Sequence, residues 1–151
     1  MRRSDREITD LVEIESVLNE AHVCRIGLSD GVEPYVVPLC FGYIDGTIYL
    51  HSATVGKKIA LLKKNPQCCF EVDLCQTIIR TEKPCAWGMR YKSVIGFGRA
   101  YFISDSKEKK HGLNCIMHHY ESGIQELSDE DIRNVCVIRI DIKSMTGKKH
   151  D

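Results

Sequence analysis

Two consecutive lysines at the start of a predicted helix are the residues of this sequence best placed to do chemistry. Lys57 and Lys58 follow Gly56, and the run from them to Pro66 has the spacing of a short helix, with Thr54 as a candidate N-cap. A cation in the first turn of a helix opposes the positive end of the helix dipole and costs about 0.3–1 kcal/mol. A bound anion removes that conflict, because the amide N–H groups and both ammonium groups then act on it together. Two interpretations stay open, a solvated basic turn and a phosphate-binding site.

A histidine ends the strand that is expected just before this helix. Residues 47–52 are rich in β-forming side chains, and His51, Ser52 and Ala53 lead into the lysine turn. An imidazole titrates near neutral pH, so His51 could hydrogen-bond a ligand or donate a proton to a substrate. The alternative is a satisfied polar group at a strand end.

Eight cysteines raise the question of a metal site or a disulfide. No two of them form a CxxC pair, and Cys115 with His118 has ligand-like spacing but no second half of a site. The adjacent His118 and His119 could suggest haem or metal ligation, yet only one of two neighbouring helix residues faces a given site. We therefore expect no metal, and thiols that pack as small hydrophobic groups in a reducing compartment.

The composition limits the classes of partner. Lys plus Arg and Asp plus Glu both number 21 in a chain of 151 residues, so no basic surface suggests nucleic acid. No apolar run reaches the ~18 residues of a membrane span, and the first residues lack the apolar stretch of a signal peptide. We expect a single domain, residues 1–151, that is soluble and cytoplasmic and contacts no membrane.

The elements that must position the lysines are mostly strands. Short turns at 29–31 and 45–46 require antiparallel neighbours, because parallel strands need a long crossover. The least patterned segment is 74–88, a candidate mobile loop with the only tryptophan, Trp87. The predicted strands are 22–28, 35–43, 47–52, 68–73, 91–103 and 135–142, and the predicted helices are 4–21 (mainly from Thr9 or Asp10), 54–65 and 106–120. This order predicts a mainly β fold, a six-stranded antiparallel Greek-key barrel with inserted helices.

Several stretches, in order along nearly the whole chain, resemble the nitroimidazole-resistance (Nim) proteins. These belong to the wider pyridoxamine 5'-phosphate oxidase-like group of FMN-binding split barrels. The matching stretches are Asp-Arg-Glu-Ile-Thr-Asp at 5–10, Tyr-Val-Val-Pro-Leu-Cys-Phe-Gly-Tyr at 35–43, all of 51–66, Tyr-Lys-Ser-Val-Ile-Gly-Phe-Gly-Arg at 91–99, and Met-Thr-Gly-Lys at 145–148.

The resemblance implies a homodimer of split β-barrels with FMN, or FAD, in each of two grooves at the interface. It places Lys57 and Lys58 on the flavin phosphate, which agrees with the helix-dipole argument. The other cofactor-binding residues that it implies are Val37, Pro38, Leu39, Cys40, His51, Ser52, Ala53, Gly56, Ser93 and Val94. Relatives commonly carry Asn where this chain has Cys40, and a thiol is a poorer hydrogen-bonding group than an amide.

The resemblance also implies an FMN-dependent oxidoreductase that acts on a small molecule. The reaction proposed for Nim proteins is reduction of the nitro group of a 5-nitroimidazole, with His51 as the candidate catalytic residue. No GxGxxG motif is present, so NAD(P)H or another electron donor would dock transiently. Trp87 and Tyr91 either cover the flavin ring or pack in the core. The alternatives are a pyridoxamine-phosphate oxidase-like enzyme and a non-catalytic flavin- or haem-binding protein.

Overall fold

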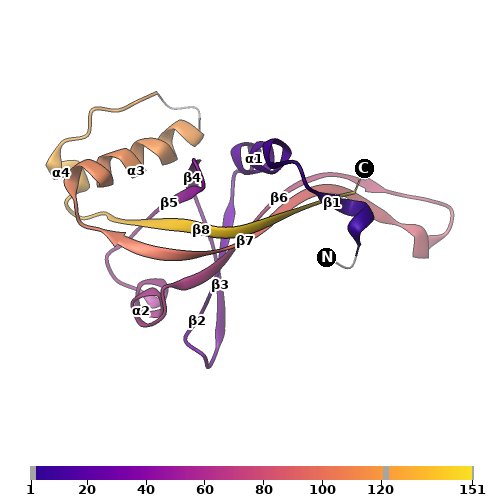
Figure 1. Ribbon diagram of the computed structural model, residues 1–151, viewed down its shortest axis with the longest axis horizontal. Helices are drawn as coiled ribbons and strands as arrows, with labels where there is room; N and C mark the ends of the chain where they lie inside the picture. Colours follow the sequence, from indigo (N-terminus) through magenta and orange to yellow (C-terminus); the bar gives the residue numbers. More distant parts are fainter. Residues whose placement is uncertain (1–2, 121–122, 151) are drawn as a thin grey trace.

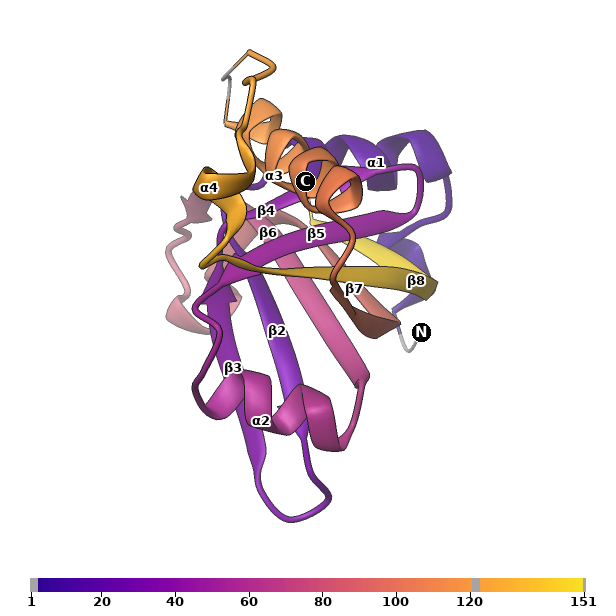
Figure 2. The same cartoon turned by 90° about the vertical axis from the view of Figure 1, so that its left-hand side faces the viewer.

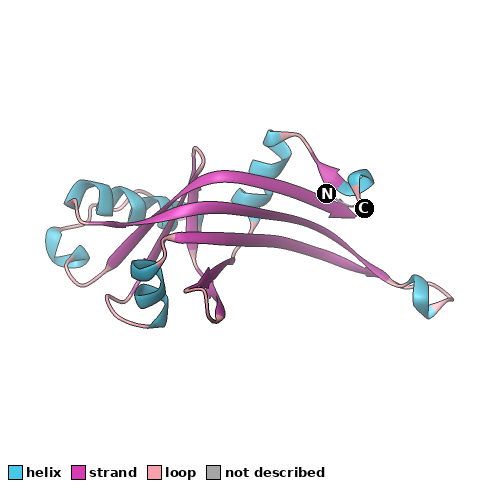
Figure 3. Ribbon diagram, turned by 60° about the horizontal axis from the view of Figure 1, so that its bottom comes forward, coloured by secondary structure: helices cyan, strands magenta, loops and turns pink. Residues whose placement is uncertain are grey.

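The computed structural model describes residues 3–120 and 123–150, and strands dominate it (Figures 1 and 3). The strands are β1 (Glu7–Ile8), β2 (Cys24–Ser29), β3 (Pro34–Leu39), β4 (Phe41–Ile44), β5 (Thr47–Ser52), β6 (Gln67–Ile79), β7 (Gly88–Ile103) and β8 (Cys136–His150). The α-helices are α1 (Leu11–Glu20), α2 (Lys57–Lys64), α3 (Ser106–His119) and α4 (Asp129–Ile132), and the 3₁₀ helices are η1 (Ser4–Arg6) and η2 (Pro84–Ala86).

All the described strands join one antiparallel sheet. The strand order is β3-β2-β6-β7-β8-β5-β4, and β1 adds to β8. β3 and β4 therefore lie at opposite edges of the sheet, although Cys40 alone separates them in the chain. The sheet must therefore curl until its two edges meet at Cys40 and separate from there. Figure 2 shows the curled sheet. This confirms the prediction of a mainly β, antiparallel fold.

The core fills the inside of the curl, and two helices pack against it. α1 buries Ile14, Val17 and Leu18 against the sheet, and its N-cap is Asp10, whose carboxylate accepts a hydrogen bond from the Val12 amide. α3 lies over β4 and β5, with Ile116 buried. The buried residues of α1 recur at the three- and four-residue spacing of an amphipathic helix.

The structure has eight strands where the sequence predicted six. The predicted strand 35–43 is two strands, because its halves pair with different neighbours: β3 with β2, and β4 with β5. The start of the predicted helix 4–21 is instead η1 and β1, since Glu7 and Ile8 pair with the end of β8. Both differences result from pairing between strands that are distant in the sequence, and such pairing leaves no local sequence pattern.

The prediction that residues 74–88 form a loop is also largely wrong, because most of this segment belongs to β6 and β7. β6 continues to Ile79 and β7 begins at Gly88, and the two strands pair with each other. A register shift after Cys75 interrupts the alternation of apolar and polar residues, which hid the strand in the sequence. β8 likewise runs past residue 142 to His150, paired with β7 throughout. The polar connection 121–134 contains α4, and its first two residues lie outside the described part of the chain.

None of the helices in the described residues has the length and apolar character needed to cross a membrane.

Candidate functional site

A pocket of about 410 Å³ lies between the edge strand β3, the end of β5 and the start of α2. Two short stretches of chain supply its walls, one from β3 and one that runs from the end of β5 into the helix. Its lining residues are Tyr35, Val37, His51, Ser52, Ala53, Val55, Gly56, Lys57 and Lys58. The structure therefore brings the predicted His51, Lys57 and Lys58 together with Val37, the one predicted residue of β3 that lines the pocket.

The pocket opens where the two edges of the sheet separate. Phe41 and Leu50 are the last pair between β4 and β5. One further step would set Cys40 opposite His51, but the chain turns away there into β3. His51 and Ser52 still pair with β8 on one side, and on the other side they line the pocket.

The start of α2 has no side-chain cap among the described residues. Its N-cap is Gly56, with φ 131° and ψ 171°, rather than the predicted Thr54. A side chain at this φ would be strained, so the backbone requires glycine here. The amide N–H groups of the first turn thus have no side-chain acceptor, and the positive end of the helix is left uncompensated.

The two lysines differ in their surroundings. Lys57 Nζ lies 2.9 Å from Glu33 Oε2 and 4.9 Å from the centre of the Tyr35 ring, and the hydrogen bond to Glu33 raises the pKa of Lys57. Lys58 is half-buried and has neither an ion pair nor a hydrogen bond to any described residue. Burial lowers the pKa of Lys58 because it disfavours the charged form. The unpaired positive charge in the pocket is therefore mainly that of Lys58.

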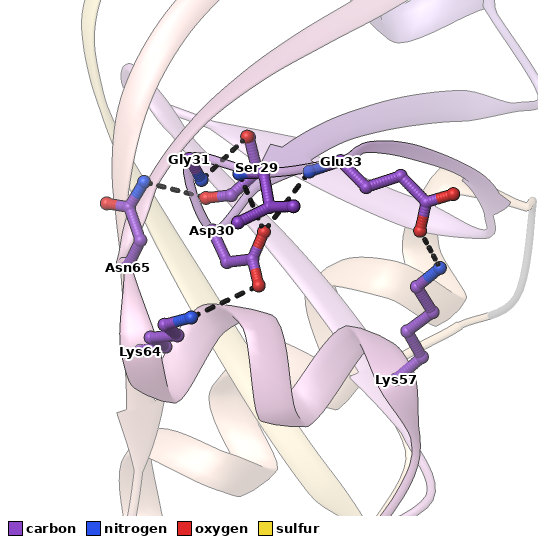
Figure 4. Close-up of polar contacts among 8 residues, drawn as sticks. Ser29, Asp30, Gly31, Glu33, Lys57, Lys64 and Asn65 are labelled. Carbon is purple, nitrogen blue, oxygen red and sulfur yellow. Dashed lines mark hydrogen bonds and ion pairs between the residues drawn. The ribbon is translucent and has the colours of Figure 1, made fainter.

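The turn between β2 and β3 is fastened to both ends of α2 (Figure 4). Glu33 binds Lys57 at the start of the helix. At the other end, Lys64 Nζ lies 3.2 Å from Asp30 Oδ2, and the Asn65 side chain donates a 2.9 Å hydrogen bond to the carbonyl oxygen of Ser29. These contacts fix the strand wall of the pocket relative to the helix.

Sequence reasoning missed three residues of this arrangement. Tyr35 and Val55 line the pocket, and Glu33 neutralises Lys57. The period-two alternation of a strand places Tyr35 on the same face as Val37, so it could have been found. No local signal links Glu33 to a lysine 24 residues further along the chain.

Five predicted cofactor-binding residues do not line the pocket. Pro38 is exposed, Leu39 packs against the core, and Cys40 is exposed at the junction between the two edges. Ser93 and Val94 lie in β7, which is paired on both sides, and Val94 is fully buried. Their role in binding a cofactor stays a prediction, and within one chain they lie apart from the lysines.

Of the two adjacent histidines on α3, His119 packs against the rest of the chain, whereas His118 is exposed. His119 Nε2 lies 2.7 Å from the carbonyl oxygen of Ala21, and its ring packs 4.3 Å from that of Phe41. Among the residues that the structure describes, no three His, Cys, Asp or Glu side chains are grouped to hold a metal ion. All eight cysteines are free thiols.

A protein-family model described as pyridoxamine 5'-phosphate oxidase matches residues 10–149. A solved structure from Bacteroides thetaiotaomicron, which bears the provisional description of a 5-nitroimidazole antibiotic resistance protein, is 38% identical. The match covers 94% of this chain and 85% of that chain, with a TM-score of 0.84.

Two further structures share the architecture. A FAD-binding protein from Mesorhizobium loti is 25% identical over 97% of this chain and 98% of its own, with a TM-score of 0.73. The FAD and heme binding protein from Mycobacterium smegmatis has a TM-score of 0.87 at 14% identity, over 97% of this chain and 74% of that one. The last likeness shows the fold alone. No curated protein matches the sequence.

Proposed function

The chain belongs to the pyridoxamine 5'-phosphate oxidase family, and from that premise we propose that it binds a flavin, FMN or FAD, at the start of α2. The observation that carries this proposal is Lys58, a half-buried ammonium group without a partner among the described residues, beside an uncapped helix N-terminus. A phosphate group at that point would satisfy the lysine and the free amide N–H groups together. The residues present therefore fit the phosphate end of a flavin.

The other pocket residues would position the rest of the cofactor. Val37 and Val55 offer apolar surface, and Ser52 offers a hydroxyl group, on the walls that lead away from the lysines. A bound flavin would supply the electron-transfer chemistry, and the protein would supply binding, orientation and electrostatics. We place the flavin ring along the end of β3 and the residue after it, which are Val37, Pro38, Leu39 and Cys40.

We assign the protein an oxidoreductase activity, with 5-nitroimidazoles as the first substrates to test. The support is the relative described as a 5-nitroimidazole antibiotic resistance protein, at 38% identity. Reduction of a nitro group consumes protons as well as electrons. His51, exposed at the pocket where β5 ends, is the candidate donor of those protons. NAD(P)H or another small donor would supply the electrons.

The active unit in this proposal is a homodimer in the cytoplasm. Ser93 and Val94 would contribute to a site only in such an assembly, since they lie apart from the pocket of their own chain. Eight free thiols fit a reducing compartment.

Purified protein tests the activity directly. We expect FMN to bind and to give a yellow protein whose absorbance bleaches with NAD(P)H and returns on addition of a 5-nitroimidazole. Bleaching that pyridoxamine phosphate alone can drive would instead support the oxidase reaction. A bound flavin that no donor reduces, or a Soret band, would support a non-catalytic flavin- or haem-binding protein.

A charge-removal variant tests the binding site. Lys57→Ala combined with Lys58→Ala should weaken FMN binding about 10-fold or more, and each tenfold corresponds to about 1.4 kcal/mol. The matched control is Lys63→Ala with Lys64→Ala, which removes the same charge from the other end of the same helix. Equal FMN affinities for the two double variants, measured by titration, would contradict the phosphate assignment.

A further inference from the structure

The ion pair between Lys57 and Glu33 lies beside the pocket and occupies one of its two lysines. Lys57 Nζ is 2.9 Å from Glu33 Oε2 and 4.9 Å from the centre of the Tyr35 ring. Lys58 lines the same pocket but has no ion pair with any described residue. One of the two ammonium groups is therefore already bound to a carboxylate of its own chain.

The turn between β2 and β3 fixes the position of Glu33. The Asp30 carboxylate accepts hydrogen bonds from the amides of Val32, at 3.1 Å, and of Glu33 itself, at 3.4 Å. Lys64, at the end of α2, binds the same carboxylate (Figure 4). The hydrogen bond from the Val32 amide and the pair with Lys64 lower the pKa of Asp30 to about 2, so this acceptor stays ionised at neutral pH. The backbone that carries Glu33 is thus held in place.

The side chain of Glu33 points to the same side as the pocket wall. Side chains alternate along extended chain, and Glu33, Tyr35 and Val37 are each two residues apart at the start of β3. Tyr35 and Val37 line the pocket, and Lys57 contacts both Tyr35 and Glu33. The Glu33 carboxylate therefore adds a negative charge next to the proposed phosphate site.

The pair is weak enough for a phosphate group to replace Glu33. The side chains of Lys57 and Glu33 are 53% and 71% exposed, and water solvates both partners of such a pair, so it contributes little. A phosphate monoester carries about 1.5–2 negative charges at pH 7 and several acceptor oxygens, so it is the stronger partner for an ammonium group. Lys57 can therefore bind the phosphate only by giving up Glu33.

We propose that Glu33 competes with the flavin phosphate for Lys57 and so limits the affinity of the site. This inference rests on the proposed flavin-binding function and concerns how tightly that site holds its ligand. The two ammonium groups and the Glu33 carboxylate together leave a single net positive charge, which is less than the charge of the phosphate. Lys58 and the start of α2 bind the phosphate, and Lys57 contributes only to the extent that Glu33 releases it.

The variant Glu33→Gln tests this competition, because it keeps the shape of the side chain and removes its charge. FMN should bind Glu33→Gln about 3- to 10-fold more tightly than wild type at low salt, measured by titration. Riboflavin lacks the phosphate and should bind both proteins equally. The matched control is Glu126→Gln, which removes the same charge from an exposed position. Its segment, residues 123–128, lies at the opposite end of the molecule from α2 in Figure 2, so FMN affinity should not change.

A double-mutant cycle with Lys57→Met separates competition from simple repulsion between Glu33 and the phosphate. Competition requires a lysine that Glu33 can release. The gain in FMN affinity from Glu33→Gln should therefore be at least about 2-fold larger when Lys57 is present than in the Lys57→Met chain. Repulsion alone would give the same gain in both chains.

Three results would overturn the inference. They are equal gains in the two chains, an FMN affinity that Glu33→Gln leaves unchanged or lowers, and a parallel gain for riboflavin, which would mean that the substitution reshapes the pocket wall. If wild type still prefers FMN to riboflavin through Lys58, each of these results leaves the proposed function intact. A wild-type protein that binds no FMN would remove both.

Discussion

The two edge strands β3 and β4 follow each other in the chain, but one is covered by a helix and the other is exposed. β4 is covered by α3: Phe41 is fully buried, its amide N–H donates a hydrogen bond to the hydroxyl of Tyr120, and its ring packs against His119. β3 stays open, with Pro34, Val36 and Pro38 exposed on its outer face and its inner face turned to the pocket. Cys40 is the single residue between them.

The difference suggests that one edge of the sheet stabilises the fold and that the other is available to bind a ligand. The covered edge contributes buried apolar surface and hydrogen bonds. The open edge keeps an uncapped helix beside a cavity, and a lysine, Lys58, that is unpaired within residues 3–120 and 123–150. Proline residues in the open edge cannot donate to another strand, so they limit unwanted strand pairing. We therefore expect changes near β4 to alter the free energy of unfolding, and changes near β3 and α2 to alter ligand affinity.

The largest expected effect tests the covered edge. A Cβ atom at Gly42 would lie 2.5 Å from the carbonyl carbon of Cys115 in α3, which belongs to the backbone and not to a flexible side chain. Gly42→Ala should lower the free energy of unfolding by about 3 kcal/mol, measured by urea denaturation. Gly123→Ala is the control, because no atom of the described residues lies within 4 Å of a Cβ there. Equal stability of the two variants would show that α3 is not tightly seated on β4.

A smaller effect concerns pH at the same edge. Burial lowers the pKa of His119 from 6.5, outweighing its contact with the Ala21 carbonyl oxygen. Above pH 6.5 both states are neutral, and as the pH falls below 6.5 the unfolded chain takes up the proton first, so stability falls. Between pH 7.5 and 5.5, wild type should lose more stability than His119→Gln, by no more than about 1 kcal/mol. Identical pH dependence in urea denaturation would argue against a buried imidazole.

The smallest expected change in stability tests the open edge. Because the pKa of Lys58 is lower in the folded state, its positive charge destabilises the fold. This destabilisation is complete at pH values below the folded pKa, and it disappears as the pH rises past 10.5, the unfolded value. Lys58→Met should therefore leave the free energy of unfolding unchanged or raise it by less than about 1 kcal/mol at pH 7. Lys57→Met, which breaks the exposed pair with Glu33, should change it by at most about 1 kcal/mol in the other direction. A clear loss of stability in Lys58→Met would mean that this lysine has a structural partner.

The same contrast separates what the sequence could predict from what it could not. The start of α2 beside Lys57 and the short β-hairpins depend on local patterns, and these were predicted. The break at Cys40 and the extension of β6 to Ile79 depend on which strands pair, and they were missed. In the site, two adjacent lysines looked equivalent until the fold brought Glu33 to only one of them.

The proposed function depends above all on Lys58 binding the phosphate of a flavin. Riboflavin lacks that phosphate, so the ratio of FMN to riboflavin affinity isolates it. We expect FMN to bind wild type at least about 10-fold more tightly than riboflavin, a difference of about 1.4 kcal/mol, and Lys58→Ala to abolish most of this preference while Lys63→Ala keeps it. The same preference in Lys58→Ala as in wild type would contradict the claim.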